Sequence, residues 1–350
     1  MSRARDLANF GNGIDAADIT DATITAGKLA AGAVEGALVT ATGRRNLIIN
    51  GAMQVAQRGT SWSNTTSSTY YLDRWSHQNR QSSVTDIDLV TNQDIGDGIM
   101  NVYKITVDTA PADTNFLINQ YIENGAYTVL GKDITISWYA RQSTGSGVTT
   151  NVAVEVDSGS TYNGTGSANS LTSSWQRFTQ TFTMSGYTAA GVTSPTLRFQ
   201  LFFKSLASTD VVELTGVQLE VGSVATPFEH RSYGEELALC QRYFYKIAAS
   251  GSSAYLCDAF STSTTQAVAL VNFPVTMRSA PTVSRANIAT NTQLRHTAGT
   301  NNLDTDTGIA GVPTIQGASV FITTSGIQVG SGFLRAAGST EISFSFDSEL

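Results

Sequence analysis

Residues 211-VVELTGVQLEVGSVATPFEHRSYGEELALCQRYFY-245 carry the strongest fold signal in this chain. The first part of this stretch alternates apolar and polar residues, with Val212 and Leu214 on one face of an extended segment. After Gly216 the alternation resumes at Val217, one position out of step, so a bulge is needed to keep the apolar residues on one side. The pattern predicts that residues 211–221 form a strand that closes a β-domain.

The second part of the stretch predicts a short helix followed by a new strand. Ser232 can begin a capping box, in which its hydroxyl accepts from the amide of Glu235 and the Glu235 carboxylate reaches back to the amide of Ser232. A helix should follow over 233–241, and RYFYKI after it returns to strand composition. We therefore expect two β-sandwiches, at 46–231 and 242–350, joined by a linker helix at 232–241.

Short strand-like segments separated by turn residues fill both halves. Those of the first half lie at 46–51, 70–75, 84–90, 100–107, 116–122, 134–140, 152–156, 175–184, 196–204 and 211–221. Those of the second half lie at 243–248, 254–260, 267–273, 282–285, 319–323, 326–329, 332–335 and 342–346. Many short strands with little helix favour an all-β fold of two jelly-roll-like sandwiches. Carbohydrate-binding modules share this architecture with capsid and lectin domains, so it does not decide the function.

Alternation is clearest in the segment 196–204. One face of this segment is apolar and carries Leu197, Phe199, Leu201 and Phe203. The other face carries Arg198, Gln200, Phe202 and Lys204.

Residues 1–45 follow a different rhythm, with an aliphatic residue at every fifth position. These residues are Ile14, Ile19, Ile24, Leu29, Val34 and Val39. A step of five fits neither the 3.6-residue period of a helix nor the two-residue period of a strand. It is similar to pentapeptide-repeat β-solenoids, but so few repeats cannot bury a continuous core alone. We expect a stalk or anchor that is ordered by assembly, through a shared threefold axis or a socket on a particle; the alternative is a disordered leader rich in Ala, Gly and Thr.

Three separated stretches carry a family resemblance: NLIINGAMQVAQRG from Asn46, LTGVQLEVGSVATPFEHRSYGEELALCQRYF from Leu214, and FPVTMRSAPTVS from Phe273. In this order they resemble a family of bacteriophage tail-fibre and virion-surface proteins common among phages of marine bacteria. The resemblance implies a structural virion protein that recognises cells. Together with the five-residue rhythm of residues 1–45, it favours a homotrimeric fibre subunit that attaches to other virion proteins through its N-terminus and contacts a host-surface glycan or receptor. It implies no catalytic residues. A capsid decoration or minor capsid protein is the alternative, and a polysaccharide hydrolase is a third.

Composition argues against two kinds of partner. Only 14% of the residues are charged, the net charge is −7, and Lys and Arg do not cluster, which argues against nucleic-acid binding. No apolar run approaches the roughly 20 residues that span a bilayer, and MSRARDLANF at the N-terminus lacks the apolar core of a secretory signal. We expect no membrane insertion. We expect synthesis in the host cytoplasm and a place on the virion.

The two cysteines are too few for a disulfide framework, and Cys240 should be a small buried hydrophobe.

Motifs for catalysis and for metal binding are missing from the sequence. His77, His230 and His296 are isolated, and His230 is expected to make a structural hydrogen bond. We expect no cofactor, although calcium binding is possible. Residues 304–308 begin like a calcium-binding loop, but they lack the later acidic ligand and are better explained as a turn. Calcium could also bind the first sandwich through ligands that the sequence does not identify. A hydrolase would need two carboxylates, and some pair among the aspartates of 73–97 stays open.

Sugar binding is the better hypothesis for the sandwiches. Such sites use exposed aromatic rings that stack on a pyranose, flanked by side chains that hydrogen-bond its hydroxyls. Trp62, in the polar loop predicted over 58–69, and Tyr162, in SGSTYNGTG, fit this description. Either ring could instead fold back over its own sandwich. Trp138 and Trp175 lie in predicted strands and are expected in the core.

Overall fold

The computed structural model describes residues 44–350 except 67, 79–82, 112–114, 157–158, 160–161, 189, 297–298 and 304–308. The six aliphatic residues predicted to drive assembly lie outside the described residues, as does the turn at 304–308. Residues 46–350 form one compact unit, in which nearly all regular structure is β-strand. The predicted all-β class, with two sandwiches joined by a short helix, is confirmed.

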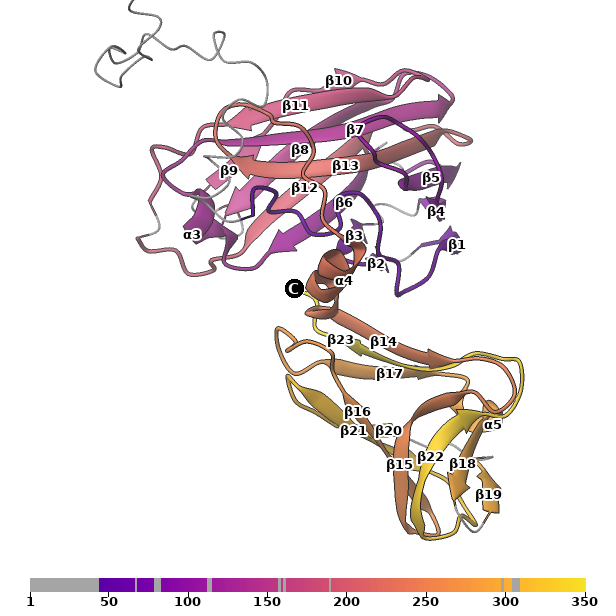
Figure 1. Cartoon of the computed structure of the whole chain (residues 1–350). Helices are drawn as coiled ribbons and strands as arrows, with labels where there is room; N and C mark the ends of the chain where they lie inside the picture. Colours follow the sequence, from indigo (N-terminus) through magenta and orange to yellow (C-terminus); the bar gives the residue numbers. More distant parts are fainter. Residues whose placement is uncertain are drawn as a thin grey trace, which may run out of the picture. The chain divides into compact units, whose positions relative to one another are not determined.

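Two antiparallel sheets form the first sandwich (Figure 1). Its strands are β1 Ser61–Thr65, β2 Thr69–Leu72, β3 Trp75–Gln78, β4 Val84–Val90, β5 Val102–Thr109, β6 Asn115–Ile122, β7 Ile134–Thr144, β8 Thr149–Val156, β9 Tyr162–Thr165, β10 Asn169–Ser170, β11 Gln176–Phe182, β12 Leu197–Lys204 and β13 Val211–Val221. One sheet has the order β1-β4-β5-β13-β7-β11. The other has the order β10-β8-β12-β6-β3-β2, with β9 beside β8.

Strand β13 lies inside the first of these sheets, between β5 and β7, and contains the predicted bulge. Its register against β7 shifts between Thr215 and Gln218, and Gly216 has a φ of +58°. Beyond the bulge, Val217 and Leu219 still face inward and are fully buried. The glycine therefore keeps the apolar face of the strand on the core side, as the sequence predicts.

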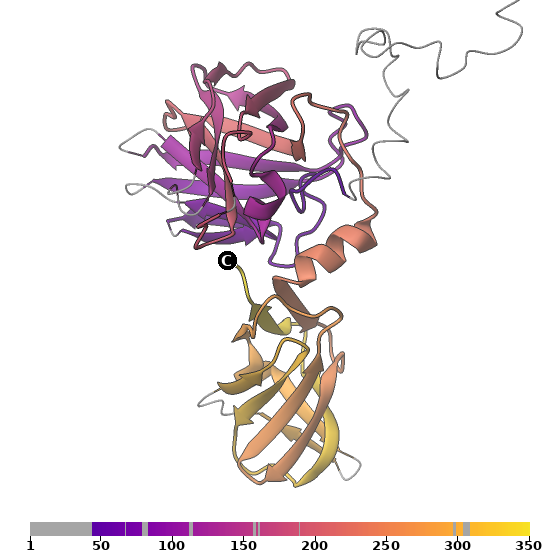
Figure 2. The ribbon, with the colours of Figure 1, turned by 90° about the vertical axis from the view of Figure 1, so that its left-hand side faces the viewer.

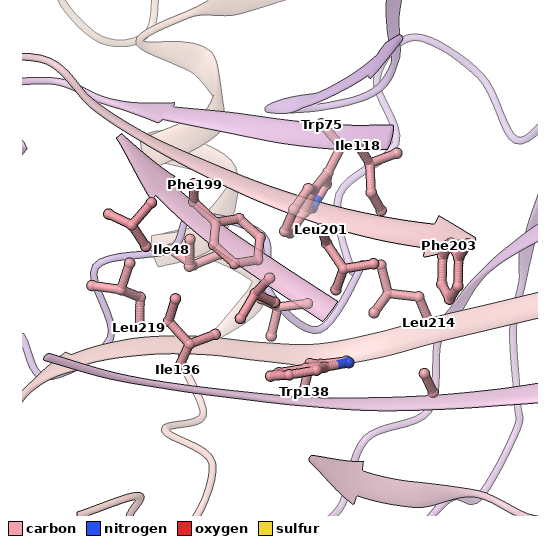
Figure 3. Packing of buried hydrophobic residues seen from close by; sticks show 14 of the residues in the cluster. Ile48, Trp75, Ile118, Ile136, Trp138, Phe199, Leu201, Phe203, Leu214 and Leu219 are labelled. Atoms are coloured by element: carbon pink, nitrogen blue, oxygen red, sulfur yellow. The ribbon is translucent and has the colours of Figure 1, made fainter. Parts of the chain in front are cut away.

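The core of the first sandwich lies between its two sheets (Figure 3). Phe199, Leu201 and Phe203 reach inward from β12, and they face residues of β7 and β13 such as Trp138 and Leu214. This confirms the predicted apolar face of the segment 196–204. It also means that the remaining side chains of β12 point away from the core.

Residues 46–51, predicted as a strand, form no strand. Distant side chains accept from three of their backbone amides: Glu229 Oε2 from the amide of Asn46 at 2.7 Å, Gln120 Oε1 from that of Ile49 at 2.8 Å, and Glu236 Oε1 from that of Asn50 at 2.5 Å. At the ends of the segment the amide of Leu47 donates to the Leu219 carbonyl of β13 at 2.8 Å, and the Gly51 carbonyl accepts from the amide of Val217 at 3.0 Å. Between them side chains take the amides, so no continuous ladder to β13 forms.

The helix α4, Tyr233–Gln241, connects the two sandwiches (Figure 2). It begins at the predicted cap, where the Ser232 hydroxyl accepts from the amide of Glu235 at 3.3 Å. Cys240 is a buried free thiol, as predicted. Two shorter helices, α3 at Gly125–Val129 and α5 at Ile288–Asn291, are not predicted.

The second sandwich pairs a small sheet with a larger one. Its strands are β14 Phe244–Ala249, β15 Tyr255–Ser263, β16 Gln266–Asn272, β17 Thr282–Ala286, β18 Thr292–His296, β19 Gly299–Asn302, β20 Ile309–Pro313, β21 Gly317–Thr323, β22 Gly330–Ala336 and β23 Ile342–Asp347. The sheets have the orders β14-β23-β17 and β19-β18-β22-β15-β16-β21-β20. The sequence misses β18, β19 and β20, and the strand that it predicts at 326–329 does not form.

Residues after β23 form a buried ion-pair cluster. Glu349 pairs with Arg74, which follows β2, and with Arg58 at 3.3 Å. The Arg74 guanidinium also lies over the ring of Tyr243, 3.5 Å from its centroid. The side chains of Arg74 and Glu349 are only 1% and 4% exposed, so this pair is almost completely removed from water.

Candidate functional site

Trp62 and Tyr162, the two aromatic residues that the sequence suggests for sugar binding, lie in different surroundings. Trp62 is in strand β1, not in a loop as predicted; it is half-buried and meets Tyr71 edge-on at 5.6 Å between centroids. It lines a hollow of about 390 Å³ together with Arg58 and other residues. Tyr162 begins β9, is 9% exposed and meets Tyr187 edge-on at 4.9 Å, so its ring is covered.

The other two tryptophans predicted to be in the core differ from each other. Trp138 is fully buried, which confirms the prediction. Trp175 lies just before β11, is half-buried, and has the guanidinium of Arg141 over its ring at 4.8 Å from the centroid. Arg141 pairs with Glu213 in turn. The core prediction for Trp175 is wrong because the ring lies on the outer surface with this ion pair.

A polar cluster, only part of which can be predicted from the sequence, lies on the outward face of β12 and its two neighbours. The register places Arg198 of β12 opposite Glu155 of β8 on one side and opposite Tyr121 of β6 on the other. Two residues further along β12, Gln200 lies opposite Asn119 of β6. A carboxylate, a guanidinium and a phenol thus form one row across three strands, with two amides in the next row.

Arg198 holds this cluster together. Its Nη1 donates to Glu155 Oε2 at 3.1 Å, and its Nη2 donates to Asn119 Oδ1 at 3.3 Å. With the Gln200 amide oriented to match its neighbours, its nitrogen donates to Glu155 Oε1 at 3.0 Å and its oxygen accepts from Arg198 at 3.0 and 3.2 Å. The guanidinium carbon also lies 5.6 Å from the centroid of the Tyr121 ring.

The charged groups of the cluster are accessible, whereas its amides are buried beneath them. The Arg198 and Glu155 side chains are 22% and 19% exposed, while Gln200 and Asn119 are 5% and 0% exposed. Asn119 Nδ2 has no hydrogen-bond partner in the described part of the chain. The buried amides therefore fix the orientation of the guanidinium and the carboxylate that a ligand would meet.

Aromatic rings flank the cluster. Tyr121 lies beside Arg198, and Phe202, two residues beyond Gln200 on β12, is half-buried with the Lys204 ammonium 5.5 Å from its ring centroid. Planar hydrogen-bonding groups between partly exposed rings provide what a sugar requires, since a pyranose presents hydroxyls at its edge and an apolar face.

Two of the three histidines make structural contacts. His230 Nε2 donates to the carbonyl of Asp97 at 2.5 Å, which confirms its predicted structural role. His77 is fully buried, edge-on to Phe116 at 4.2 Å between centroids, and burial lowers its pKa to about 3. Among the described residues, no three His, Cys, Asp or Glu side chains gather in a way that could hold a metal ion. No helix in the same part of the chain is long and apolar enough to cross a membrane.

No protein-family model and no curated protein sequence matches this chain. Three solved structures illustrate the structural likenesses. The xylan-binding domain CBM22-1 of Paenibacillus barcinonensis Xyn10C is 16% identical, with 47% of this chain and 94% of that chain covered and a TM-score of 0.30. A family 11 carbohydrate-binding module of Clostridium thermocellum, solved with a mixed-linked tetrasaccharide, is 11% identical, with coverages of 49% and 97% and a TM-score of 0.31. The arabinofuranosidase MgGH51 is 11% identical, with 49% of this chain but only 26% of that chain covered and a TM-score of 0.31. At such scores and identities, none of these likenesses transfers a function to this chain.

Proposed function

We propose that this protein is a non-catalytic virion subunit that binds a host-surface glycan through the outward face of β8, β12 and β6. The observation that carries the proposal is the accessible pair of Arg198 and Glu155, held in place by buried amides. A carboxylate accepts from one sugar hydroxyl while a guanidinium donates to its neighbour. Because the pair is oriented before a ligand arrives, binding costs little side-chain entropy.

The flanking rings complete the proposed site. Tyr121 and Phe202 lie on either side of the buried amides along the outward face, so an extended saccharide could contact both. Each ring adds apolar contact to the C–H face of a sugar, and the central polar groups select the orientation of its hydroxyls. The proposed ligand is therefore a glycan that spans several strands.

The place on a particle rests on the resemblance to phage tail-fibre proteins and on the five-residue pattern of residues 1–45. An aliphatic rhythm that a single chain cannot bury favours a trimer with the sandwiches displayed around it. Three linked sites would raise avidity without any new contact, because the second and third binding events become intramolecular. The alternative, which the low charge and sparse catalytic residues support equally well, is a decoration protein that binds the shell and contacts no receptor.

Arg198→Ala tests the proposed binding face. Loss of a charged hydrogen-bonding group costs about 1.5–3 kcal/mol, so affinity for polysaccharide purified from the host surface should fall about 10- to 140-fold in titration calorimetry. Lys132→Ala is the matched control: it removes one positive charge from an exposed side chain of the same sandwich, whose ammonium donates to the Thr128 carbonyl at 2.9 Å. Equal affinity of the Arg198 variant and the wild type would exclude this face.

Deletion of residues 1–45 tests the proposed assembly. The truncated chain should keep folded sandwiches but be monomeric by sedimentation and absent from particles. A truncated chain that still trimerises and joins the virion would exclude the stalk. Protein that coats capsids but neither binds host cells nor competes with infection would favour the decoration role, and release of reducing sugar from host polysaccharide would favour the hydrolase.

A further inference from the structure

A second surface of interest lies on the outward face of β15, β22, β18 and β19, which are neighbours in the larger sheet of the second sandwich (Figure 1). The strand registers place eight side chains there in two rows. One row across the four strands is Tyr255, Arg335, Gln293 and Asn302, and the next is Asp258, Phe333, Arg295 and Thr300. Strands about 4.8 Å apart and a rise of about 3.4 Å per residue make this patch roughly 14 Å by 7 Å.

Aromatic rings occupy one end of the patch. Tyr255 is 56% exposed, and its ring centroid lies 5.7 Å from that of Phe333 with 49° between the planes. The Tyr255 hydroxyl donates to Asp258 Oδ1 at 3.1 Å, which fixes the outer end of the ring. The two rings thus form a platform that is open to solvent, with a carboxylate at its edge.

The other end of the patch is rich in oriented polar groups. Arg335 Nε donates to Gln293 Oε1 at 3.0 Å, and Gln293 Nε2 donates to Asn302 Oδ1 at 2.9 Å. Arg295 Nη1 donates to the Thr300 hydroxyl. Neutral partners therefore orient both guanidiniums along the sheet surface.

The charges of this patch are unbalanced. Neither Arg295 nor Arg335 has an ion-pair partner among the residues that the structure describes, although the chain as a whole carries a net charge of −7. Asp258 is the single carboxylate in the two rows. Two arginines without acidic partners on an acidic protein favour an anionic ligand, and a guanidinium matches a carboxylate or sulfate through paired hydrogen bonds.

We propose that this patch is a second saccharide site, independent of the first, which takes an acidic sugar. The ring of the sugar would stack on Tyr255 and Phe333, and its carboxylate or sulfate would bind Arg335 and Arg295. The amides of Gln293 and Asn302 would accept hydrogen bonds from hydroxyls of the next sugar along the row and donate hydrogen bonds to them. A chain with both sites would bind a glycan that carries neutral and acidic units at two points.

Binding of the full chain to immobilised polygalacturonate, dextran sulfate, dextran and single-stranded DNA, measured by biolayer interferometry, tests this proposal. We expect binding to polygalacturonate or dextran sulfate, which separates carboxylate from sulfate recognition. Binding to dextran, which has no acidic group for Arg335 and Arg295, should be at least tenfold weaker. Tyr255→Ala and Arg335→Gln should each weaken this binding at least tenfold. Tyr233→Ala, which removes a tyrosine that is 57% exposed on α4, should not change it.

Two further variants separate the failure of this site from the failure of the first site or of folding. Arg198→Ala should leave binding to the acidic polymers intact, so failure of the first site and failure of this one are distinguishable. If thermal unfolding shows that Tyr255→Ala or Arg335→Gln does not fold, Arg295→Gln takes its place, because Arg295 is exposed and its replacement should leave the fold intact. Absence of binding to both acidic polysaccharides, equal binding to dextran, or equal binding to DNA would overturn the proposal.

Discussion

Replacing Gly216 by alanine should destabilise the first sandwich by about 2–5 kcal/mol, the sum of two costs. The residue has a φ of +58°, where an L-residue costs about 1–2 kcal/mol. An added Cβ would also lie 2.7 Å from Ile99 Cδ1 and 2.8 Å from Tyr139 Cδ2. Moving packed side chains away from an added methyl group typically costs about 1–3 kcal/mol.

Gly147→Ala separates these two costs. Gly147 lies in the same sandwich with a φ of +88°, and nothing lies within 4 Å of the added Cβ, so its replacement carries the backbone cost alone. Urea unfolding can be followed by the fluorescence of the buried residues Trp75 and Trp138. At a slope of about 2 kcal/mol per molar urea, the Gly216 variant should lose about 1–2.5 M of midpoint and the Gly147 variant at most about 1 M. Equal midpoints for the two variants would refute the close packing at the bulge.

Two further predictions concern buried ionisable side chains. Burial lowers the pKa of His77 in the folded state to about 3, below its ordinary value of 6.5, so between these values the unfolded chain binds one more proton and the wild type loses stability as the pH falls. Between pH 7 and pH 4 this effect lowers the free energy of unfolding of the wild type by about 3 kcal/mol, and His77→Leu should abolish that contribution. If the urea midpoint changes between these pH values as much in the variant as in the wild type, His77 is not the cause. Glu349→Gln leaves Arg74 buried without its charge partner and should cost about 3–5 kcal/mol. Glu341→Gln breaks the surface pair with Lys246 and should cost less than about 1 kcal/mol. Equal losses of melting temperature for the two variants would contradict a larger contribution of the buried pair.

Features that depend on neighbouring residues could be predicted from the sequence. The strand at 211–221, its bulge and the helix at 233–241 follow from apolar alternation, one glycine and one capping serine, all within a few positions. The inward face of β12 follows from the same alternation. Local chemistry suffices in these cases because no distant partner decides the conformation.

Features that depend on distant residues could not be predicted. The segment at 46–51 has strand composition, but side chains from Gln120, Glu229 and Glu236 take its backbone amides. Strand β1, SWSNT, is the opposite case: it lacks an apolar alternation and becomes a strand by pairing with β4 at the edge of the sheet. The sequence therefore predicts a loop around Trp62. In both cases the sequence signal is overridden by contacts made elsewhere in the fold.

Only the β12 half of the candidate binding face could be predicted from the sequence. The alternation of residues 196–204 places Arg198, Gln200 and Phe202 together on one side of a strand. It does not reveal that Glu155 and Tyr121 lie beside them, because the registers of β8 and β6 against β12 depend on pairing across the sheet. A partly exposed phenylalanine between an arginine and a lysine on the solvent side of a strand is the part of the pattern that points to a binding face.

Both proposed saccharide faces centre on a strand with a neighbour on each side. Arg198 lies on β12, between β8 and β6, and Arg335 lies on β22, between β15 and β18. A strand inside a sheet has cross-strand partners on both sides, and these can orient a long side chain through hydrogen bonds, as Asn119 does for Arg198 and Gln293 does for Arg335. An edge strand such as β1 offers partners on one side only. The interior of a sheet therefore gives the better position for a rigid binding face, although loops at the ends of a sandwich are the parts that composition alone suggests.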